Sequence, residues 1–280
     1  MRSPAMRCGI FVWAAIALML APCAASLADD KNLLEKRFYV AVGSFINAST
    51  MKIRLDGQAG EIGTPIEWSR TFGDQEKTRL RADALWRIGG RHYMRFMYTD
   101  YSRSSSRRIA EEITWEGDVI PVDAVATGTF SFEVIEAAYE YAFIKRPDLE
   151  VAGSLGLHYT TLEATLTAQV SVGGESGTVK RGGDANVDAP LPVIGARALW
   201  RFSDNWYLDG LAQAFYLSTS DLEGSILNSR VAVLWQPVPR FGLGAGFDWF
   251  RTNVDSEDPG FRGNLNWTYQ GPQLFFSLAF

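Results

Sequence analysis

Cysteine and histidine are nearly absent from this chain of 280 residues. Both cysteines, Cys8 and Cys23, lie near the N-terminus, and the two histidines, His92 and His158, are far apart in the sequence. Beyond Cys23 the sequence therefore excludes a disulfide framework and cysteine-based metal sites. Two widely separated histidines are also a poor metal site. We expect no bound metal and no cofactor.

An excess of basic charge is missing as well. The formal net charge is −5 and the isoelectric point is about 5.2. Nucleic-acid-binding proteins usually carry a clustered basic patch. The composition therefore gives no reason to expect a nucleic-acid partner.

Long apolar runs are limited to one short segment, residues 10–21, which follows Arg2 and Arg7. Its twelve residues are too few for the ~20 that a membrane-spanning helix needs. Ser26 and Ala28 place small residues at positions −3 and −1 of a cleavage site, as in secretory signals. We expect a signal peptide over residues 1–28, exported through the Sec pathway and cleaved after Ala28.

The remaining chain predicts a short periplasmic segment, 29–36, and one domain, 37–280, in which polar and apolar residues alternate. Such alternation is typical of strands with one apolar face. A soluble sandwich alternates too, but three features favour a closed antiparallel transmembrane β-barrel. The segments reach the 9–11 residues of a tilted membrane strand, aromatic residues recur at their ends, and short connections alternate with long polar ones. We predict about ten strands, with eight or twelve as alternatives, at 37–47, 76–88, 91–101, 128–144, 149–166, 191–203, 205–219, 224–236, 239–252 and 263–280.

Some parts of this pattern are irregular. Residues 51–72 and 107–117 could add hairpins and give twelve strands, and long links are expected around 102–127, 167–190 and 253–262. The apolar face also changes sides between Val134 and Ile135, which predicts a β-bulge there.

Charged residues follow the polar face of many predicted strands. A ten-stranded barrel is only slightly wider than eight-stranded barrels, which side chains fill, and an unpaired buried charge costs several kcal/mol. We therefore expect a narrow lumen in which Arg79, Arg81, Arg95, Arg197 and Arg201 pair with Glu136, Glu140 and Glu150. The full expected lumen set is Lys77, Arg79, Arg81, Arg87, Arg95, Arg197, Arg201 and Arg230 with Asp83, Glu136, Glu140, Glu150, Asp209 and Asp248.

The last ten residues, GPQLFFSLAF, resemble the closing strand of Gram-negative outer-membrane proteins, with Leu274, Phe276, Leu278 and Phe280 on one face. Residues 91–103 also resemble a segment of small proteobacterial outer-membrane barrels of the OmpA-type and porin-like superfamily. The resemblance implies an outer-membrane location, contact with lipid and lipopolysaccharide, and recognition of these four residues by the barrel-assembly machinery. Because no residue follows Phe280, it implies no peptidoglycan-binding domain.

These observations leave three classes of function, of which a structural or surface-interaction barrel comes first and a porin-like channel for small solutes second. An outer-membrane lipid hydrolase is a distant third. The best candidate for its site is His158-Tyr-Thr160, but no Gly-x-Ser-x-Gly motif occurs. A lone histidine on a strand more often belongs to a polar network, so we expect no enzyme. The sequence does not indicate a solute or an oligomeric state.

Overall fold

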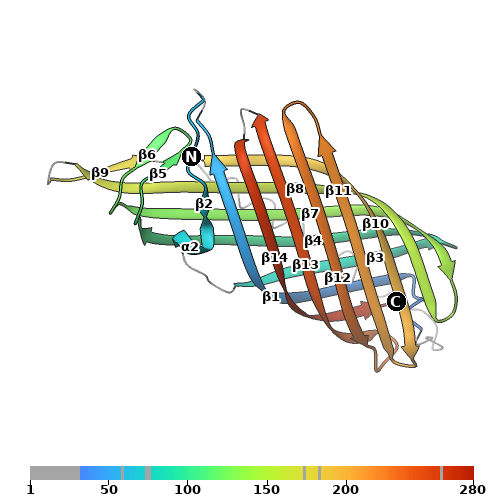
Figure 1. Ribbon diagram of the computed structural model, residues 1–280. Helices are drawn as coiled ribbons and strands as arrows, with labels where there is room; N and C mark the ends of the chain where they lie inside the picture. Colours follow the sequence, from blue (N-terminus) through green and yellow to red (C-terminus); the bar gives the residue numbers. More distant parts are fainter. Residues whose placement is uncertain (1–31, 58–59, 73–76, 173–174, 182–183, 259–260) are drawn as a thin grey trace, which may run out of the picture. The chain divides into compact units, whose positions relative to one another are not determined.

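The computed structural model describes residues 32–57, 60–72, 77–172, 175–181, 184–258 and 261–280. Within these residues, ten long antiparallel strands form one closed sheet, because β1 pairs with β14 and β8 pairs with β10 (Figure 1). The barrel strands are β1 (Phe38–Leu55), β3 (Lys77–Gly89), β4 (His92–Arg108), β7 (Val125–Lys145), β8 (Leu149–Val172), β10 (Asp184–Ser203), β11 (Trp206–Ser218), β12 (Leu222–Trp235), β13 (Phe241–Asp258) and β14 (Phe261–Ala279). The predicted fold and the strand number of ten are confirmed; the expected signal peptide lies outside the described residues.

Smaller elements gather at one end of the barrel. β2 (Ile66–Glu67) pairs with β1 and leads into helix α2 (Trp68–Phe72), whose Trp68 and Phe72 are buried. β5 (Ile113–Trp115) and β6 (Asp118–Ile120) form a separate hairpin, and β9 (Glu175–Arg181) extends the sheet beside β8. Residues 51–72 and 107–117 therefore add no barrel strands, which excludes the twelve-strand alternative.

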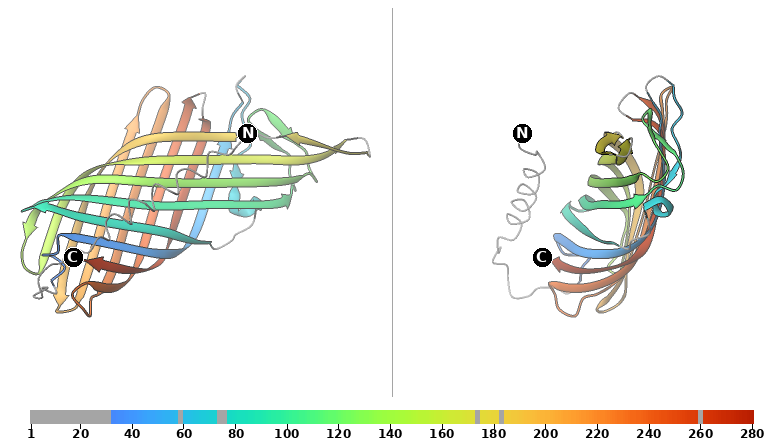
Figure 2. Two further views of the ribbon diagram at one scale, coloured as in Figure 1. Left: turned by 180° about the vertical axis from the view of Figure 1, so that it is seen from behind. Right: turned by 90° about the vertical axis from the view of Figure 1, so that its left-hand side faces the viewer.

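The two ends of the barrel differ in their connections. At one end, here called the turn end, the strands are joined through residues 90–91, 146–148, 204–205 and 236–240, and β1 begins and β14 ends there. Gly90 enables the first of these tight turns by adopting a positive φ of 52°. The opposite end, the loop end, carries α2, β5, β6 and β9, and long strands such as β7, β8 and β10 run toward it (Figure 2, left).

Two of the long links that we expected at the loop end are largely strand. β8, β9 and β10 cover most of residues 167–190, and β13 and β14 leave only residues 259–260 between them. The physical reason is that main-chain pairing continues beyond the length needed to cross a bilayer. Polar residues on these extensions produced a loop-like pattern, although their backbones pair as strands.

The bulge that we expected between Val134 and Ile135 is absent, because β7 pairs in unbroken register with β4 and β8 at these positions. Register shifts in the barrel occur instead beside the short turns, at Arg87/Gly89, Ala142/Ile144 and Arg201/Ser203. The inward face keeps its parity along β7, but its chemistry changes. Toward the turn end, Glu136 and Glu140 are buried inside the barrel, and toward the loop end apolar side chains such as Phe132 and Val134 take their place.

The outward face is apolar along most strands. Leu155, Ile194 and Leu274 expose 63%, 65% and 70% of their surface. Aromatic rings gather near the turn end, where Trp206 stacks on Trp235 with centroids 6.2 Å apart. Within the described residues, no helix combines the length and apolarity required to cross a bilayer.

Candidate functional site: the charged layer of the lumen

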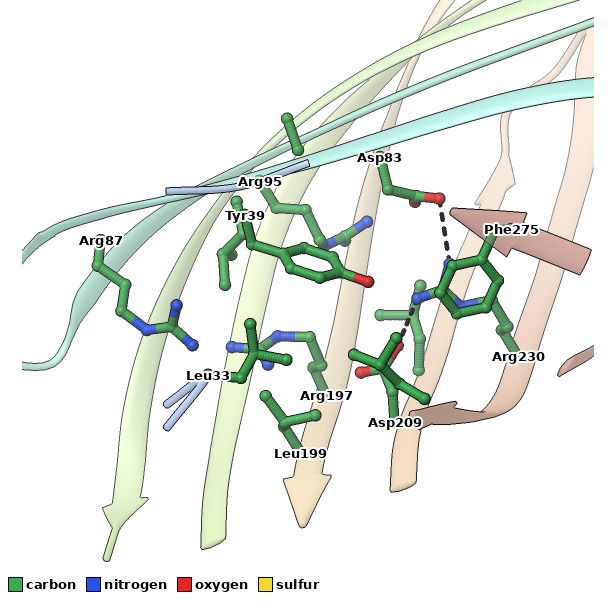
Figure 3. Close-up of a pocket in the computed structure, with 14 residues that line it drawn as sticks. Leu33, Tyr39, Asp83, Arg87, Arg95, Arg197, Leu199, Asp209, Arg230 and Phe275 are labelled. Atoms are coloured by element: carbon green, nitrogen blue, oxygen red, sulfur yellow. Dashed lines mark hydrogen bonds and ion pairs between the residues drawn. The ribbon is translucent and has the colours of Figure 1, made fainter. Parts of the chain in front are cut away.

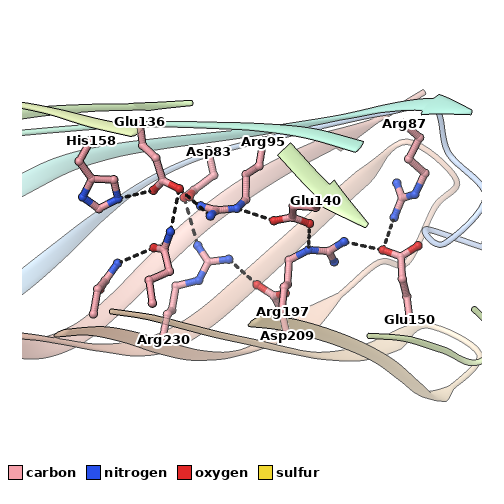
Figure 4. A network of polar contacts seen from close by, with 12 residues as sticks. Asp83, Arg87, Arg95, Glu136, Glu140, Glu150, His158, Arg197, Asp209 and Arg230 are labelled. Carbon is pink, nitrogen blue, oxygen red and sulfur yellow. Dashed lines mark hydrogen bonds and ion pairs between the residues drawn. The ribbon is translucent and has the colours of Figure 1, made fainter. Parts of the chain in front are cut away.

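A layer of ion pairs, in two branches, occupies the lumen in the half nearer the turn end (Figure 4). We call it the charged layer; its members are Arg81, Asp83, Arg87, Arg95, Glu136, Glu140, Glu150, Arg197, Asp209, Arg230 and Asp248. Strand alternation directs these side chains inward: members that share a strand lie an even number of residues apart, as Arg81, Asp83 and Arg87 do on β3 and Glu136 and Glu140 do on β7.

Glu140 is at the centre of the first branch. Its two carboxylate oxygens accept hydrogen bonds from Arg95 Nε at 2.7 Å and from Arg197 Nε at 2.8 Å. Each arginine then reaches a second carboxylate: Arg95 Nη2 lies 2.6 Å from Glu136, and Arg197 Nη2 lies 2.5 Å from Glu150. The chain of pairs thus links β4, β7, β8 and β10.

Neutral and weakly basic side chains complete both ends of this branch. Glu150 also accepts a hydrogen bond from the Tyr93 hydroxyl at 2.8 Å. At the other end, Glu136 accepts one from Gln213 Nε2 at 2.8 Å and lies 2.9 Å from His158 Nε2. The histidine therefore belongs to the polar network.

A second branch crosses the barrel between β3 and β11–β13. Arg81 contacts Asp83 at 2.8 Å and Asp248 at 3.2 Å. Arg230 lies 3.1 Å from Asp83 and also pairs with Asp209. These pairs join residues that are up to 167 positions apart in the sequence.

Burial makes this pairing necessary. Glu136, Glu140 and Glu150 are fully buried, and Arg81, Arg95 and Arg197 expose 2%, 5% and 6% of their surface. Desolvating a charge costs several kcal/mol, and a partner with good hydrogen-bond geometry offsets that cost. The layer therefore holds charges in the barrel interior by satisfying them internally.

Two of the predicted arginines lie outside the layer. Arg201 is partly exposed beside a short turn and contacts Asp204 there at 3.4 Å, because its strand is ending. The prediction that Arg201 pairs with the three glutamates of the lumen is therefore wrong. The side chain of Lys77 is not among those that the structure describes.

Arg79 is 2% exposed and makes no hydrogen bond to any described residue. Its guanidinium carbon instead lies 4.0 Å from the ring centroid of Tyr101, 4.5 Å from that of Tyr269, 5.0 Å from that of Trp267 and 5.5 Å from that of Phe45. Aromatic faces attract a desolvated guanidinium by about 2 kcal/mol or more. Arg79 thus faces the lumen as expected, but aromatic rings surround it in place of carboxylates.

Residues just before β1 belong to the segment 29–36, which we expected to be a short periplasmic stretch and for which the sequence indicated no contact with the barrel. Leu33 and Leu34 are 3% exposed and pack in one apolar cluster with Tyr207, Leu234 and Phe275. The Tyr207 hydroxyl accepts a hydrogen bond from the Leu33 amide at 3.1 Å. This segment and the charged layer border a cavity with about 590 Å³ of empty space, including space open to solvent (Figure 3). In the sequence, the two consecutive leucines Leu33 and Leu34 are the feature that could have indicated that this segment packs against the barrel interior.

The four residues of the C-terminal motif point outward. Leu274 and Phe276 are exposed, Leu278 is half-buried and Phe280 exposes 39% of its surface. Phe280 and Phe38 exchange two backbone hydrogen bonds of 2.7 and 2.9 Å, and their rings lie 5.4 Å apart. The last residue therefore closes the seam between the first and last barrel strands.

Two observations on the described residues concern metal and nucleophile chemistry. The described residues contain no group of three or more histidine, cysteine or acidic side chains placed to hold a metal ion. His158 contacts Glu136, and the buried hydroxyl of Thr160 makes no hydrogen bond to any described residue. His158 and Thr160, the candidate hydrolase residues of the sequence analysis, are thus not joined by a hydrogen bond.

Solved structures supply the comparison that bears on the fold. The outer membrane protease OmpT of Escherichia coli matches with a TM-score of 0.56 over 87% of this chain and 96% of that chain, at 10% identity. The fold is that of an outer-membrane β-barrel. At this identity the likeness extends to the fold alone. The NalP autotransporter translocator domain of Neisseria meningitidis (TM-score 0.48, 13% identity, 87% and 88% coverage) and the Pseudomonas putida toluene transporter TodX (0.37, 8%, 90% and 92%) are more distant.

Sequence comparison adds no closer relationship to this outer-membrane barrel fold. No family model matches the chain, and no curated protein matches it.

Proposed function

We propose that the protein is an integral outer-membrane barrel of the structural or surface-interaction class, with a lumen that does not conduct solutes. The observation that carries this proposal is the charged layer. In it, Glu140 on β7 accepts hydrogen bonds of 2.7 Å from Arg95 on β4 and of 2.8 Å from Arg197 on β10. A porin needs an open aqueous path. Here buried ion pairs and the Leu33-Leu34 segment occupy the interior.

The apolar outward face supports the membrane location. Side chains such as Ile194 and Leu274 would be costly in water but suit a lipid environment. A closed barrel satisfies its own backbone groups, which any strand structure in lipid requires. The location in the outer membrane, and contacts with lipid and lipopolysaccharide, follow as part of the proposal.

Orientation follows from the connections. Outer-membrane barrels have short periplasmic turns and longer external loops, so the turn end faces the periplasm and the loop end faces outward. Phe280 then lies at the periplasmic end of the seam, where the barrel-assembly machinery can bind the outward-facing residues Leu274, Phe276, Leu278 and Phe280. Export through the Sec pathway with cleavage of residues 1–28 belongs to the same proposal.

Solute flux into vesicles tests whether the lumen conducts solutes. Refolded barrel is inserted into liposomes, its insertion is measured by a heat-dependent gel shift, and arabinose-driven swelling and single-channel conductance are recorded on the same preparation. We expect no swelling above that of empty liposomes and no steady openings. Steady openings by barrels whose insertion has been verified would refute the closed lumen and favour the porin-like alternative.

A further inference from the structure

The loop half of the lumen is lined by apolar side chains. Interiors of transmembrane barrels are ordinarily polar, yet a buried apolar cluster here reaches from Phe132 and Val134 on β7 to Leu265 and Trp267 on β14. Aromatic contacts fill one part of it, such as Phe132 against Trp267 with centroids 4.5 Å apart. The remaining part, on the side of β8 and β10–β13, is hollow.

This hollow is a pocket with about 740 Å³ of empty space, including the part open to solvent. Its lining comes from seven strands and includes Phe132, Thr160, Leu191, Phe215, Ile226 and Val254. No charged side chain is among these lining residues.

Polar groups in the pocket are few, and one of them is unused. The Thr252 hydroxyl donates to the carbonyl oxygen of Ser225 at 3.1 Å. The Thr160 hydroxyl is buried, lines the pocket and has no hydrogen-bond partner among the described residues. A ligand with a single hydrogen-bond acceptor would satisfy it.

Beside this pocket, the strands of the barrel wall extend least far toward the loop end. β11 ends at Ser218 and β12 begins at Leu222, whereas β7 and β8 extend over 21 and 24 residues. Leu217 is the last inward-facing residue of β11, and it lines the pocket. Access is therefore from the loop end, above the β11–β12 hairpin.

We propose that this pocket binds an uncharged hydrocarbon group of a small molecule or a lipid acyl chain, with Thr160 donating a hydrogen bond to a lone acceptor on it. Apolar cavities of this kind hold water poorly and take up apolar molecules. Charged ligands are excluded, because no lining side chain carries a charge that could pair with them. This inference goes beyond the proposed structural role and does not depend on it.

Photolabelling can locate the ligand by strand parity. Refolded barrel in detergent micelles is labelled with an alkyl diazirine the length of octane, and the modified residues are mapped by tandem mass spectrometry. Probe molecules in the micelle that contact the outer surface label the outward residues Tyr216 and Leu227. Probe molecules bound in the pocket label the inward neighbours Phe215 and Ile226. We expect inward labelling that saturates with probe concentration and outward labelling that does not. Absent or non-saturating inward labelling would overturn the proposal.

Matched variants separate the pocket from the outer surface. Leu217→Trp fills the pocket and should reduce labelling of the inward residues several-fold. The neighbouring residue Tyr216 lies on the outer surface and is 67% exposed, so Tyr216→Trp should leave that labelling unchanged. Val254→Phe serves the same purpose if Leu217→Trp does not refold. Equal inward labelling in a refolded pocket variant and in the wild type contradicts the assignment.

Competition identifies the source of the hydrocarbon and the role of the hydroxyl. Displacement of the label by naphthalene points to free small molecules, displacement only by lipopolysaccharide vesicles points to acyl chains, and displacement by neither refutes the site. Thr160→Val should weaken competition by 2-nonanone several-fold without affecting that by nonane. The labelling pattern is independent of conductance, so a conducting barrel would refute the proposed function and leave this test intact.

Discussion

Glu140→Gln removes the central charge of the layer with almost no change in shape. In the wild type the carboxylate receives one hydrogen bond from Arg95 at 2.7 Å and one from Arg197 at 2.8 Å. Glutamine keeps one oxygen acceptor, and its amide group donates, so one of the two guanidinium groups faces a donor. Both arginines remain buried in the barrel.

The size of the effect follows from what each arginine retains. Removing one partner of a buried pair costs about 3–5 kcal/mol, because a buried charge is left uncompensated. Here Arg95 still reaches Glu136 at 2.6 Å and Arg197 still reaches Glu150 at 2.5 Å. We therefore expect a loss near the lower limit, about 3 kcal/mol in the free energy of unfolding.

Urea unfolding of the barrel in lipid vesicles, followed by tryptophan fluorescence and by the gel shift, measures this loss. The matched control is Glu163→Gln, which affects an exposed carboxylate on β8 that accepts one hydrogen bond from Ser131 at 3.2 Å. An exposed interaction of this kind contributes about 0–1 kcal/mol. If the two variants lost the same stability, the charged layer would not be the buried, mutually dependent network that its geometry indicates.

Further predictions concern single positions. Deleting Phe280 should lower the amount of barrel in the outer membrane of cells while leaving refolding in detergent largely intact; equal cellular amounts would contradict an assembly role. Mass spectrometry of outer-membrane material should find an N-terminus directly after Ala28, and a mature chain that retains Met1 would exclude the signal peptide. Gly244→Ala should lower stability by about 1–3 kcal/mol in urea unfolding, because the new Cβ overlaps the Phe275 ring; an unchanged midpoint would contradict this. Arg79→Met leaves no carboxylate unpaired, so its loss should stay below that of Glu140→Gln in the same assay, and a larger loss would refute the aromatic account of this arginine.

The strands could be predicted because each has an apolar outward face, and lipid imposes that requirement along its whole length. Trp86 and Leu80 on β3, for example, alternate with Arg79 and Arg81, so the direction of each side chain follows from the pattern alone. Where the inward face is also apolar, as at Phe132 on β7, the pattern loses its contrast. The wrongly predicted bulge at Val134 arose there.

Placement along a strand was harder to predict than the choice of face. Arg201 has the inward parity of Arg197, yet it lies near the end of its strand and contacts a turn residue, Asp204. Arg79 has the parity of Arg81, yet it lies one layer closer to the loop end, among aromatic rings. Such differences depend on how far strands are shifted against one another around the barrel, which no local pattern contains.

Arg81 and Asp248 lie on strands that are not neighbours in the sheet, and so do Arg230 and Asp83. A partly assembled sheet, before it curls, would hold Arg81 away from Asp248 and Arg230 away from Asp83, although Arg81 would keep Asp83 on its own strand and Arg230 would keep Asp209 on the adjacent strand. Intermediates with an open sheet therefore lack these two ion pairs across the lumen, which form only when β1 meets β14. Closing the wall at β1 and β14 therefore also completes the second branch of the charged layer.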